Sequence, residues 1–116
     1  MEHRQYPAKL VGVVDGDTVD VEVDLGFRTY KKIRLRIKGI DTSEVYGVPK
    51  DTTEYETGVE QSAFAEEFLA GGGEWPLLVK TYEEEKGRYG RWVADIFVDG
   101  NSYAEAVLEN WPDAEY

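Results

Sequence analysis

Hydrophobic and polar residues alternate along two segments in the first third of the chain. The segment 18–24 (TVDVEVD) alternates valine with acidic residues, and the segment 30–40 (YKKIRLRIKGI) alternates aliphatic with basic residues. A period of two places the apolar side chains on one face, so both segments are predicted to be half-buried strands. The basic side chains on the opposite face of the second strand are Arg34, Arg36 and Lys38.

Three other short apolar segments predict further strands. They span residues 9–14 (KLVGVV), 75–82 (WPLLVKTY) and 91–98 (RWVADIFV). DGD, LGF and the hairpin loop 83–90 (EEEKGRYG) supply turn residues between strands. A longer polar segment, residues 41–58, contains glycine and proline and is predicted to be a loop. A loop of that length in a small domain often has a function.

Residues 59–70 are predicted to form a helix. Phe64 and Phe68 are four residues apart, which places both rings on one helical face. Thr57 followed by Glu60 forms a candidate capping box at the start of this helix. The glycine triplet that follows residue 70 would end it.

A second, shorter helix is predicted near the C-terminal end of the sequence. Ser102 can cap it, and it would reach Glu109 before Pro112 prevents its continuation. Three strands, a helix, two strands and a helix, in 116 residues, predict a single domain over residues 1–116. The expected class is α+β, mainly β: a five-stranded OB-fold barrel with two or three packed helices.

The charge of the chain changes the range of partners to consider. It carries 13 basic and 24 acidic residues, a net charge of −11. Taken alone, this excess of acid argues against a polyanionic partner. An acidic surface also suits a protein adapted to molar salt, where the Debye length falls to about 3 Å and repulsion is screened. A viral or mobile-element protein of a high-salt host and an acidic mesophilic protein both remain open.

The composition also limits the chemistry. There is no cysteine, which excludes a thiolate metal site. His3 is the only histidine, which strongly disfavours a histidine-centred triad. No apolar run is long enough for a membrane span, and the first residues lack the apolar region of a signal peptide. We therefore expect a cytoplasmic or intracellular monomer without a membrane partner, acting through carboxylates, arginines, hydroxyls and a hard cation.

Several polar residues cluster at predicted strand ends, which can converge at one rim of a small barrel. They are Asp15 and Asp17 in the first turn, Arg36 on the third strand, Asp41, Thr42 and Glu44 after it, and Arg91 at the start of the fifth. Each has an ordinary explanation as a turn residue, a solvated face or a surface charge. Together they could supply oxygen ligands for Ca²⁺, a carboxylate that acts as a base, and two arginines that bind a phosphate.

The order and spacing of these residues resemble the staphylococcal-nuclease-like (thermonuclease) family. The segments that carry the resemblance are VVDGDTV, RIKGIDTSE and RYGRWVADIFVDG, and it extends over about residues 8–109. The resemblance implies an OB-fold barrel with helices, in agreement with the order of the predicted elements. It also implies that Asp17 and Asp41 ligate Ca²⁺ by carboxylate and Thr42 by its carbonyl, with Asp15 close to the metal.

The same resemblance implies roles in phosphodiester hydrolysis. Glu44 would be the general base, or would position the attacking water, and Arg36 and Arg91 would bind the scissile phosphate. Tyr89 would contact a nucleotide phosphate, and we expect Arg88 and Lys38 to be further substrate contacts. The implied activity is endonucleolytic and exonucleolytic cleavage of DNA, and of RNA, at the P–O5′ bond to leave 3′-phosphates, with single strands preferred.

Some features depart from that family, and two other functions stay open. Ser43 stands where the family commonly has proline, and Glu83 to Glu85 place acidic residues before RYGR. The sequence ends about where the family usually continues into a third helix. The three tryptophans could stack on bases, but packing against the core or a helix is expected of each.

The alternative functions are a non-catalytic OB-fold module that binds nucleic acid or protein, and a structural Ca²⁺-binding domain.

Overall fold

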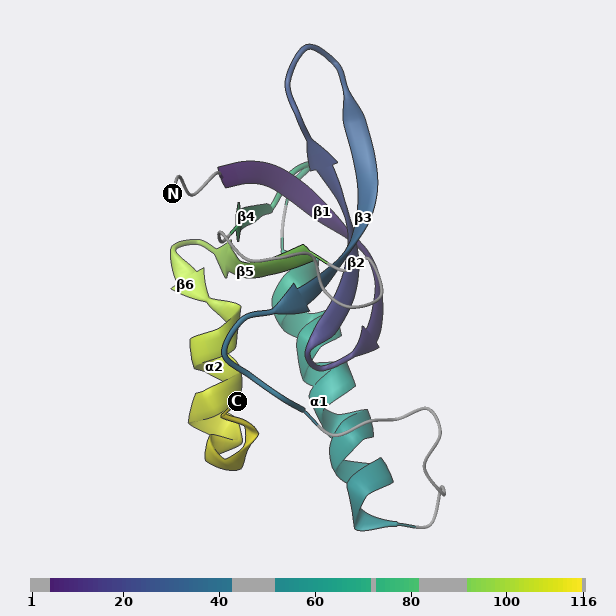
Figure 1. Cartoon of the computed structure of the whole chain (residues 1–116), viewed down its shortest axis with the longest axis vertical. Coiled ribbons are helices and arrows are strands. Elements are labelled where there is room, and N and C mark those ends of the chain that lie inside the picture. The colour runs from purple at the N-terminus through teal and green to yellow at the C-terminus, as the bar shows by residue number, and fades with distance from the viewer. Residues whose placement is uncertain (1–4, 43–51, 72, 82–91, 116) are drawn as a thin grey trace.

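The computed structural model describes residues 5–42, 52–71, 73–81 and 92–115 (Figure 1). In this part of the chain the elements are β1 (Gln5–Asp15), β2 (Thr18–Asp24), β3 (Tyr30–Ile37), α1 (Thr53–Ala70), β4 (Leu77–Thr81), β5 (Trp92–Val98), β6 (Asn101–Ser102), α2 (Tyr103–Asn110) and the 3₁₀ turn η1 (Pro112–Ala114). Neither described α-helix is long and apolar enough to cross a membrane.

Five of the strands close into a barrel. The sheet order is β3-β2-β1-β4-β5-β6, and a further parallel pairing of β3 with β5 joins the two sides. The other barrel pairs are antiparallel. This arrangement confirms the predicted α+β, mainly β class and the five-stranded OB-fold-like barrel with packed helices. The additional strand β6, which was not predicted, is only two residues long.

The core follows from the alternation along β2 and β3. Val19, Val21 and Val23 are no more than 2% exposed, and Leu35 and Ile37 face the same interior. Burying each such side chain contributes about 1.5–3 kcal/mol of transfer free energy, which explains why the pairing register is well specified. The predicted faces of both strands are therefore confirmed.

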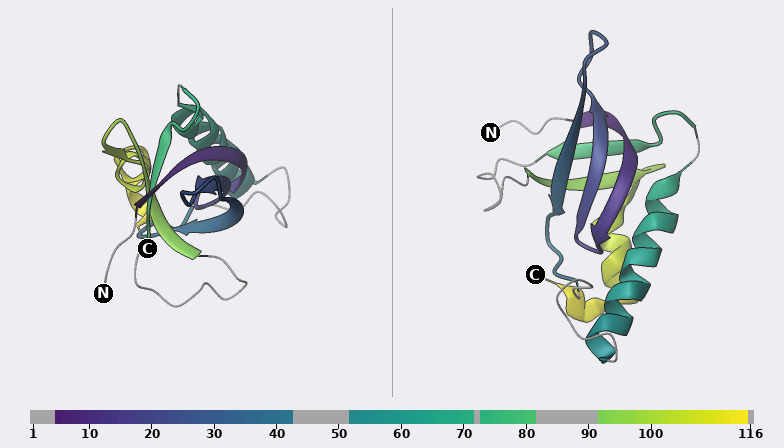
Figure 2. Two further views of the ribbon diagram at one scale, coloured as in Figure 1. Left: turned by 90° about the horizontal axis from the view of Figure 1, so that it is seen from above. Right: turned by 90° about the vertical axis from the view of Figure 1, so that its right-hand side faces the viewer.

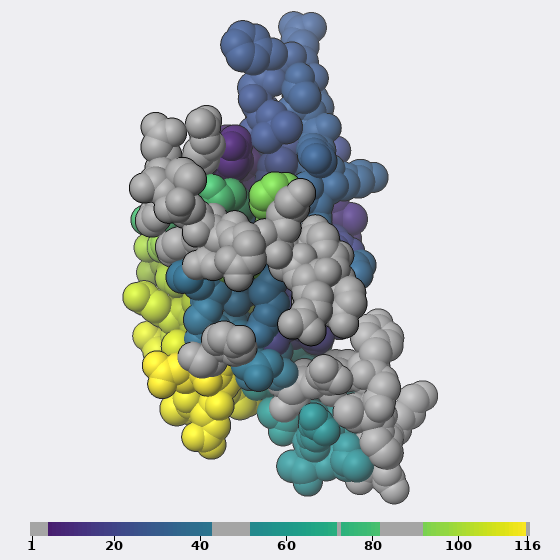
Figure 3. All heavy atoms as spheres, in the orientation of Figure 1, coloured from purple at the N-terminus to yellow at the C-terminus, as the bar shows by residue number. Residues whose placement is uncertain are grey.

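The two helices pack against one end of the barrel, whereas the β2–β3 hairpin projects from the other (Figures 1 and 2). Phe64 and Phe68 of α1 lie against Tyr103 of α2, with ring centroids 6.3 Å and 5.6 Å apart. In the space-filling view the hairpin stands clear of the rest of the molecule, and Phe27 at its tip is fully exposed (Figure 3).

The helix α1 begins earlier than predicted. Its first residue is Thr53, and the Thr52 hydroxyl accepts the Tyr55 amide hydrogen bond at 3.2 Å, so Thr52 and not Thr57 is the N-cap. The predicted capping box is wrong because the first turns of α1 are polar and carry no apolar period. The predicted loop is thus shortened from its C-terminal side. Its residues 43–51, like the predicted hairpin loop before β5, lie outside the described residues.

The three tryptophans differ in their surroundings. Trp111 meets Phe64 of α1 edge to face at 5.5 Å, so it packs on a helix as expected. Trp75 stacks at 5.4 Å on Tyr30, an exposed residue of β3, and so packs on neither the core nor a helix. Trp92, which was also expected to be packed, leaves 43% of its surface exposed at the start of β5. The apolar pattern of β5 could not show this, because the first residue of a strand can lie at the rim of the barrel.

Candidate active site at one end of the barrel

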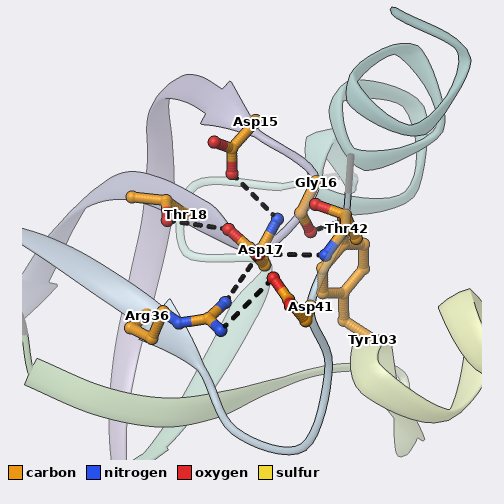
Figure 4. Close-up of polar contacts among 8 residues, drawn as sticks. All are labelled: Asp15, Gly16, Asp17, Thr18, Arg36, Asp41, Thr42 and Tyr103. Atoms are coloured by element: carbon orange, nitrogen blue, oxygen red, sulfur yellow. Dashed lines mark hydrogen bonds and ion pairs between the residues drawn. The ribbon is translucent and has the colours of Figure 1, made fainter. Parts of the chain in front are cut away.

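Polar residues from three separate segments meet at the end of the barrel nearest the helices (Figure 4). The β2–β3 register pairs Thr18 with Arg36, which brings the arginine beside Asp17 in the preceding turn. One guanidinium nitrogen of Arg36 lies 2.7 Å from Asp17 Oδ2, and the other lies 3.8 Å from Asp41 Oδ1. The predicted convergence of strand ends is therefore observed for these residues.

Asp17 is the most enclosed carboxylate of this group, with 7% of its surface exposed. Its Oδ1 accepts the Thr18 hydroxyl at 2.9 Å, and its Oδ2 accepts the Thr42 amide at 3.0 Å. Burial alone would raise the pKa of Asp17, but interactions with the Asp15 carboxyl, Arg36 and these two donors lower it overall. Asp17 therefore stays ionised and oriented.

Asp15 lies beside Asp17 and differs from it in charge. Its Oδ1 accepts the Asp17 amide at 3.2 Å. Burial, followed by hydrogen bonding and repulsion from the Asp17 side chain, raises the pKa of Asp15 to about 7. The two neighbouring carboxyls thus take different protonation states near neutral pH, one ionised and the other partly protonated.

The Asp15→Asn variant is expected to flatten the dependence of stability on pH. The folded-state pKa of about 7 exceeds the ordinary aspartate value of 3.8, so the folded protein binds more protons between these pH values, and its stability falls as pH rises through them. Asp15 is only half-buried, so the effect is partly screened by solvent. Between pH 4.5 and pH 8 we expect the free energy of unfolding of the variant to rise by about 1 kcal/mol or more relative to that of wild type.

Urea unfolding of both proteins without metal would measure this difference, with Asp24→Asn on the exposed hairpin as the control. Parallel pH profiles for wild type and Asp15→Asn would contradict it.

A buried hydrogen bond holds the turn between these aspartates. The Tyr103 hydroxyl donates to the Gly16 carbonyl at 2.5 Å, and Tyr103 is fully buried. Burial, and then the carboxylates of Asp17 and Asp15, raise the pKa of Tyr103, so its hydroxyl keeps its proton and remains a donor. Sequence reasoning missed Tyr103, because the contact joins residues 87 positions apart and no local motif marks it.

Gly16 itself has no room for a side chain. A Cβ atom at this position would lie 2.9 Å from the Thr42 side chain, whereas one at Gly12 would meet nothing within 4 Å. We therefore expect Gly16→Ala to cost about 1–3 kcal/mol of stability by overpacking, and Gly12→Ala to cost much less. Chemical unfolding of the two variants tests this difference, and equal midpoints would show that the turn tolerates the displacement of Thr42.

The described residues fit a hard cation by their chemistry. Asp15, Asp17 and Asp41 offer only oxygen, and Arg36 balances part of their charge. Thr42 is buried, and among the described residues its Oγ1 has no hydrogen-bond partner beside this acidic turn. The side chain of Asp41 is 63% exposed, and within the described part of the chain the acidic side chains do not surround a common point as a metal cluster.

Comparison with known proteins adds a distant relationship. No family model matches this chain. The uncharacterized protein MJ1439 of Methanocaldococcus jannaschii is 32% identical over 117 aligned positions, which cover 86% of this chain and 52% of that protein. Thermonuclease of Staphylococcus hyicus is 30% identical over 101 positions, which cover 87% of this chain and 54% of the thermonuclease. The chain spans about half the length of these curated relatives, and the comparison suggests a distant staphylococcal-nuclease-like relationship.

The basic side chains on the outer face of β3 differ in their surroundings. Arg34 donates to both carboxylate oxygens of Asp20, at 2.8 Å and 3.1 Å. Glu22, which the register places opposite Lys32, lies 3.5 Å from the ammonium group of Lys9 on β1. Lys38 is exposed just after β3. Asp20 and Glu22 on β2 thus each pair with a basic residue of a neighbouring strand, on β3 and on β1 respectively.

Four predicted site residues cannot be placed in this geometry. Glu44, Arg88, Tyr89 and Arg91 all lie outside the described residues. The described site consists of Asp15, Asp17, Arg36, Asp41 and Thr42, and their roles remain predictions.

Proposed function

We propose that this chain is a phosphodiesterase domain that hydrolyses single-stranded DNA, and RNA, with Ca²⁺ as cofactor. The observation that carries the proposal is the Arg36 guanidinium, which faces the carboxylates of Asp17 and Asp41 at one end of the barrel. The distant relationship to a thermonuclease supports the same class of reaction. A binding module would have no need for the full set of Asp17, Arg36, Asp41, Glu44 and Arg91.

Arg36 is suited to bind a phosphate in the transition state. Its side chain is 21% exposed, and the carboxylate of Asp17 orients it from the protein side. A planar guanidinium can donate two parallel hydrogen bonds to phosphate oxygens, and a preoriented donor stabilises charge that develops there without reorganising. Arg34, its neighbour on the same face of β3, is paired with Asp20 instead and has a side chain that is 53% exposed.

Asp17, Asp41 and the Thr42 carbonyl would hold Ca²⁺, with Asp15 beside them. When bound, the ion would polarise the phosphate and offset its negative charge. The partly protonated Asp15 would give up its proton more readily next to a cation, since an added positive charge lowers a carboxyl pKa. The turn thus has acidic groups that a cation would neutralise.

The remaining roles come from residues that match the family by sequence. Glu44 would orient or deprotonate a water whose oxygen attacks phosphorus, while the P–O5′ bond breaks and the leaving oxygen takes up a proton. Arg91 would bind the same phosphate and assist the leaving oxygen. Tyr89, Arg88 and Lys38 would contact the flanking nucleotides. The products would carry 3′-phosphates and 5′-hydroxyls.

Analysis of the cleavage products tests this proposal. The chain would be incubated with 5′-labelled single-stranded DNA, RNA and duplex DNA in Ca²⁺, and the new ends would be treated with a 3′-phosphatase. Shortened single strands whose ends become extendable by a polymerase only after that treatment are expected. Binding of single strands without any cleavage, by folded protein, would support the non-catalytic module instead.

A further inference from the structure

A buried network of hydrogen bonds ties the first turn of α2 to β5. Asp95 is 7% exposed, and its Oδ2 accepts the Ser102 hydroxyl at 2.5 Å. Its Oδ1 accepts the amides of Ile96 at 2.8 Å and Ala104 at 3.3 Å. Ser102 in turn caps α2 by accepting the Glu105 amide at 3.2 Å. The N-terminus of α2 is therefore fixed relative to the barrel wall.

Tyr103 follows Ser102 directly and extends this network to the acidic turn. Its ring lies against Phe64 and Phe68 of α1, so the direction of its hydroxyl is set by packing. That hydroxyl donates to the Gly16 carbonyl (Figure 4). A residue of the C-terminal helix thus contacts the turn that connects the first two strands.

The contact falls on the peptide unit that orients Asp17. The Gly16 carbonyl and the Asp17 amide belong to the same planar group. Tyr103 binds its oxygen, and the Asp15 carboxyl accepts its N–H at 3.2 Å. With both ends held, the plane cannot rotate, and the Asp17 side chain is directed toward Arg36 and the Thr42 amide.

We propose that Tyr103 is a positioning residue for the active site, through which α2 sets the orientation of the Asp15–Gly16–Asp17 turn. The inference deepens the proposed function and depends on it for the effect on cleavage. Its effect on the geometry of the turn does not depend on any activity. Small displacements of catalytic groups can cost about 100-fold in rate, so one hydroxyl at this point is expected to matter.

The test compares Tyr103→Phe, which removes only the hydroxyl, with Phe68→Leu, which loosens the packing of the same ring. Ser102→Ala is the second variant, because it weakens the α2 cap and leaves the hydroxyl of Tyr103 in place. Each protein would be checked for folding by circular dichroism. The measurements are kcat and KM on single-stranded DNA, Ca²⁺ affinity by calorimetry, and the backbone amide NMR signals of Asp17 and Thr42.

We expect Tyr103→Phe to lower kcat by about 10–100-fold with little change in KM. The Asp17 and Thr42 amide signals should shift, and Ca²⁺ affinity should fall. Ser102→Ala and Phe68→Leu should move these values in the same direction by less, because both variants keep the Tyr103 hydroxyl. Unchanged amide signals and kcat in folded Tyr103→Phe, or an equal loss in Phe68→Leu, would overturn the proposal.

The failure of the proposed function would look different. If wild type does not cleave, the amide signals still report whether the Tyr103 hydroxyl orients the turn. A shift at Asp17 and Thr42 that is largest in Tyr103→Phe would then support the positioning role, and its absence would reject it.

Discussion

Replacing Arg36 with alanine is expected to slow the cleavage of single-stranded DNA by about 10²–10³-fold, which is the usual effect of removing one preoriented donor to transition-state charge. The loss should appear mainly in kcat, because the interaction is strongest when charge develops on the phosphate. Arg36→Lys should recover only part of the rate, since an ammonium cannot make the paired contacts of a guanidinium. Steady-state kinetics on a fluorescent oligonucleotide would measure these effects.

The matched control is Arg34→Ala. Arg34 lies two residues away on the same strand, but its guanidinium is taken up by Asp20 and its side chain is 53% exposed. Its loss should change the cleavage rate little and the stability by no more than about 1 kcal/mol. A near-wild-type rate in Arg36→Ala, or similar losses in both variants, would remove Arg36 from the mechanism.

Replacing Asp17 with asparagine is expected to be similarly severe and to abolish the response to calcium. A bound cation contributes several kcal/mol of transition-state stabilisation, so the rate should fall by about 100-fold or more. The fold should also lose about 1–3 kcal/mol without metal, because a neutral amide cannot accept from Arg36, Thr18 and Thr42 as the carboxylate does.

Thermal unfolding with and without Ca²⁺ separates the two effects. Ligand that binds only folded protein raises the melting temperature, so wild type should be stabilised by the ion and Asp17→Asn should not. Asp20→Asn, which removes the partner of Arg34 on the same hairpin, is the control and should keep the calcium response. If Asp17→Asn retained that response, the cation would have to be bound elsewhere.

Much of the barrel could be predicted because its strands obey a period of two. The alternation along residues 18–24 and 30–37 gave the buried faces, and the order of elements gave the barrel. The first strand is longer than predicted because Ala8 is buried between two partners, Val23 on β2 and Leu77 on β4. The residues around Ala8 include polar residues and a proline, so the sequence shows no apolar alternation there and the burial of Ala8 could not be predicted.

The site was predictable where neighbouring strands determine it. Arg36 meets Asp17 because a hairpin register places it opposite Thr18. The ion pair of Arg34 with Asp20 follows from the same register. The basic residues of this strand, counted without their cross-strand partners, indicated a basic surface instead. The Tyr103–Gly16 bond could not be predicted, since it depends on how α2 docks after the barrel has closed.

The chain carries an excess of acidic over basic residues, 24 against 13. Part of it serves the cross-strand pairs and the cluster around Arg36. A high-salt origin stays a prediction, and it implies that folding and activity rise with KCl. Loss of the fold above about 1 M KCl would count against it, because screening leaves little repulsion at that concentration.

The most direct measurement is the cleavage of single-stranded DNA by the whole chain with Ca²⁺ and with a chelator, from low to molar KCl, with Glu44→Ala in parallel. If the chain is a calcium-dependent nuclease, wild type cleaves in Ca²⁺, stops in chelator, and loses its activity in the Glu44→Ala variant. Folded wild type that cleaves nothing at any salt, or that cleaves equally well in chelator, would contradict it.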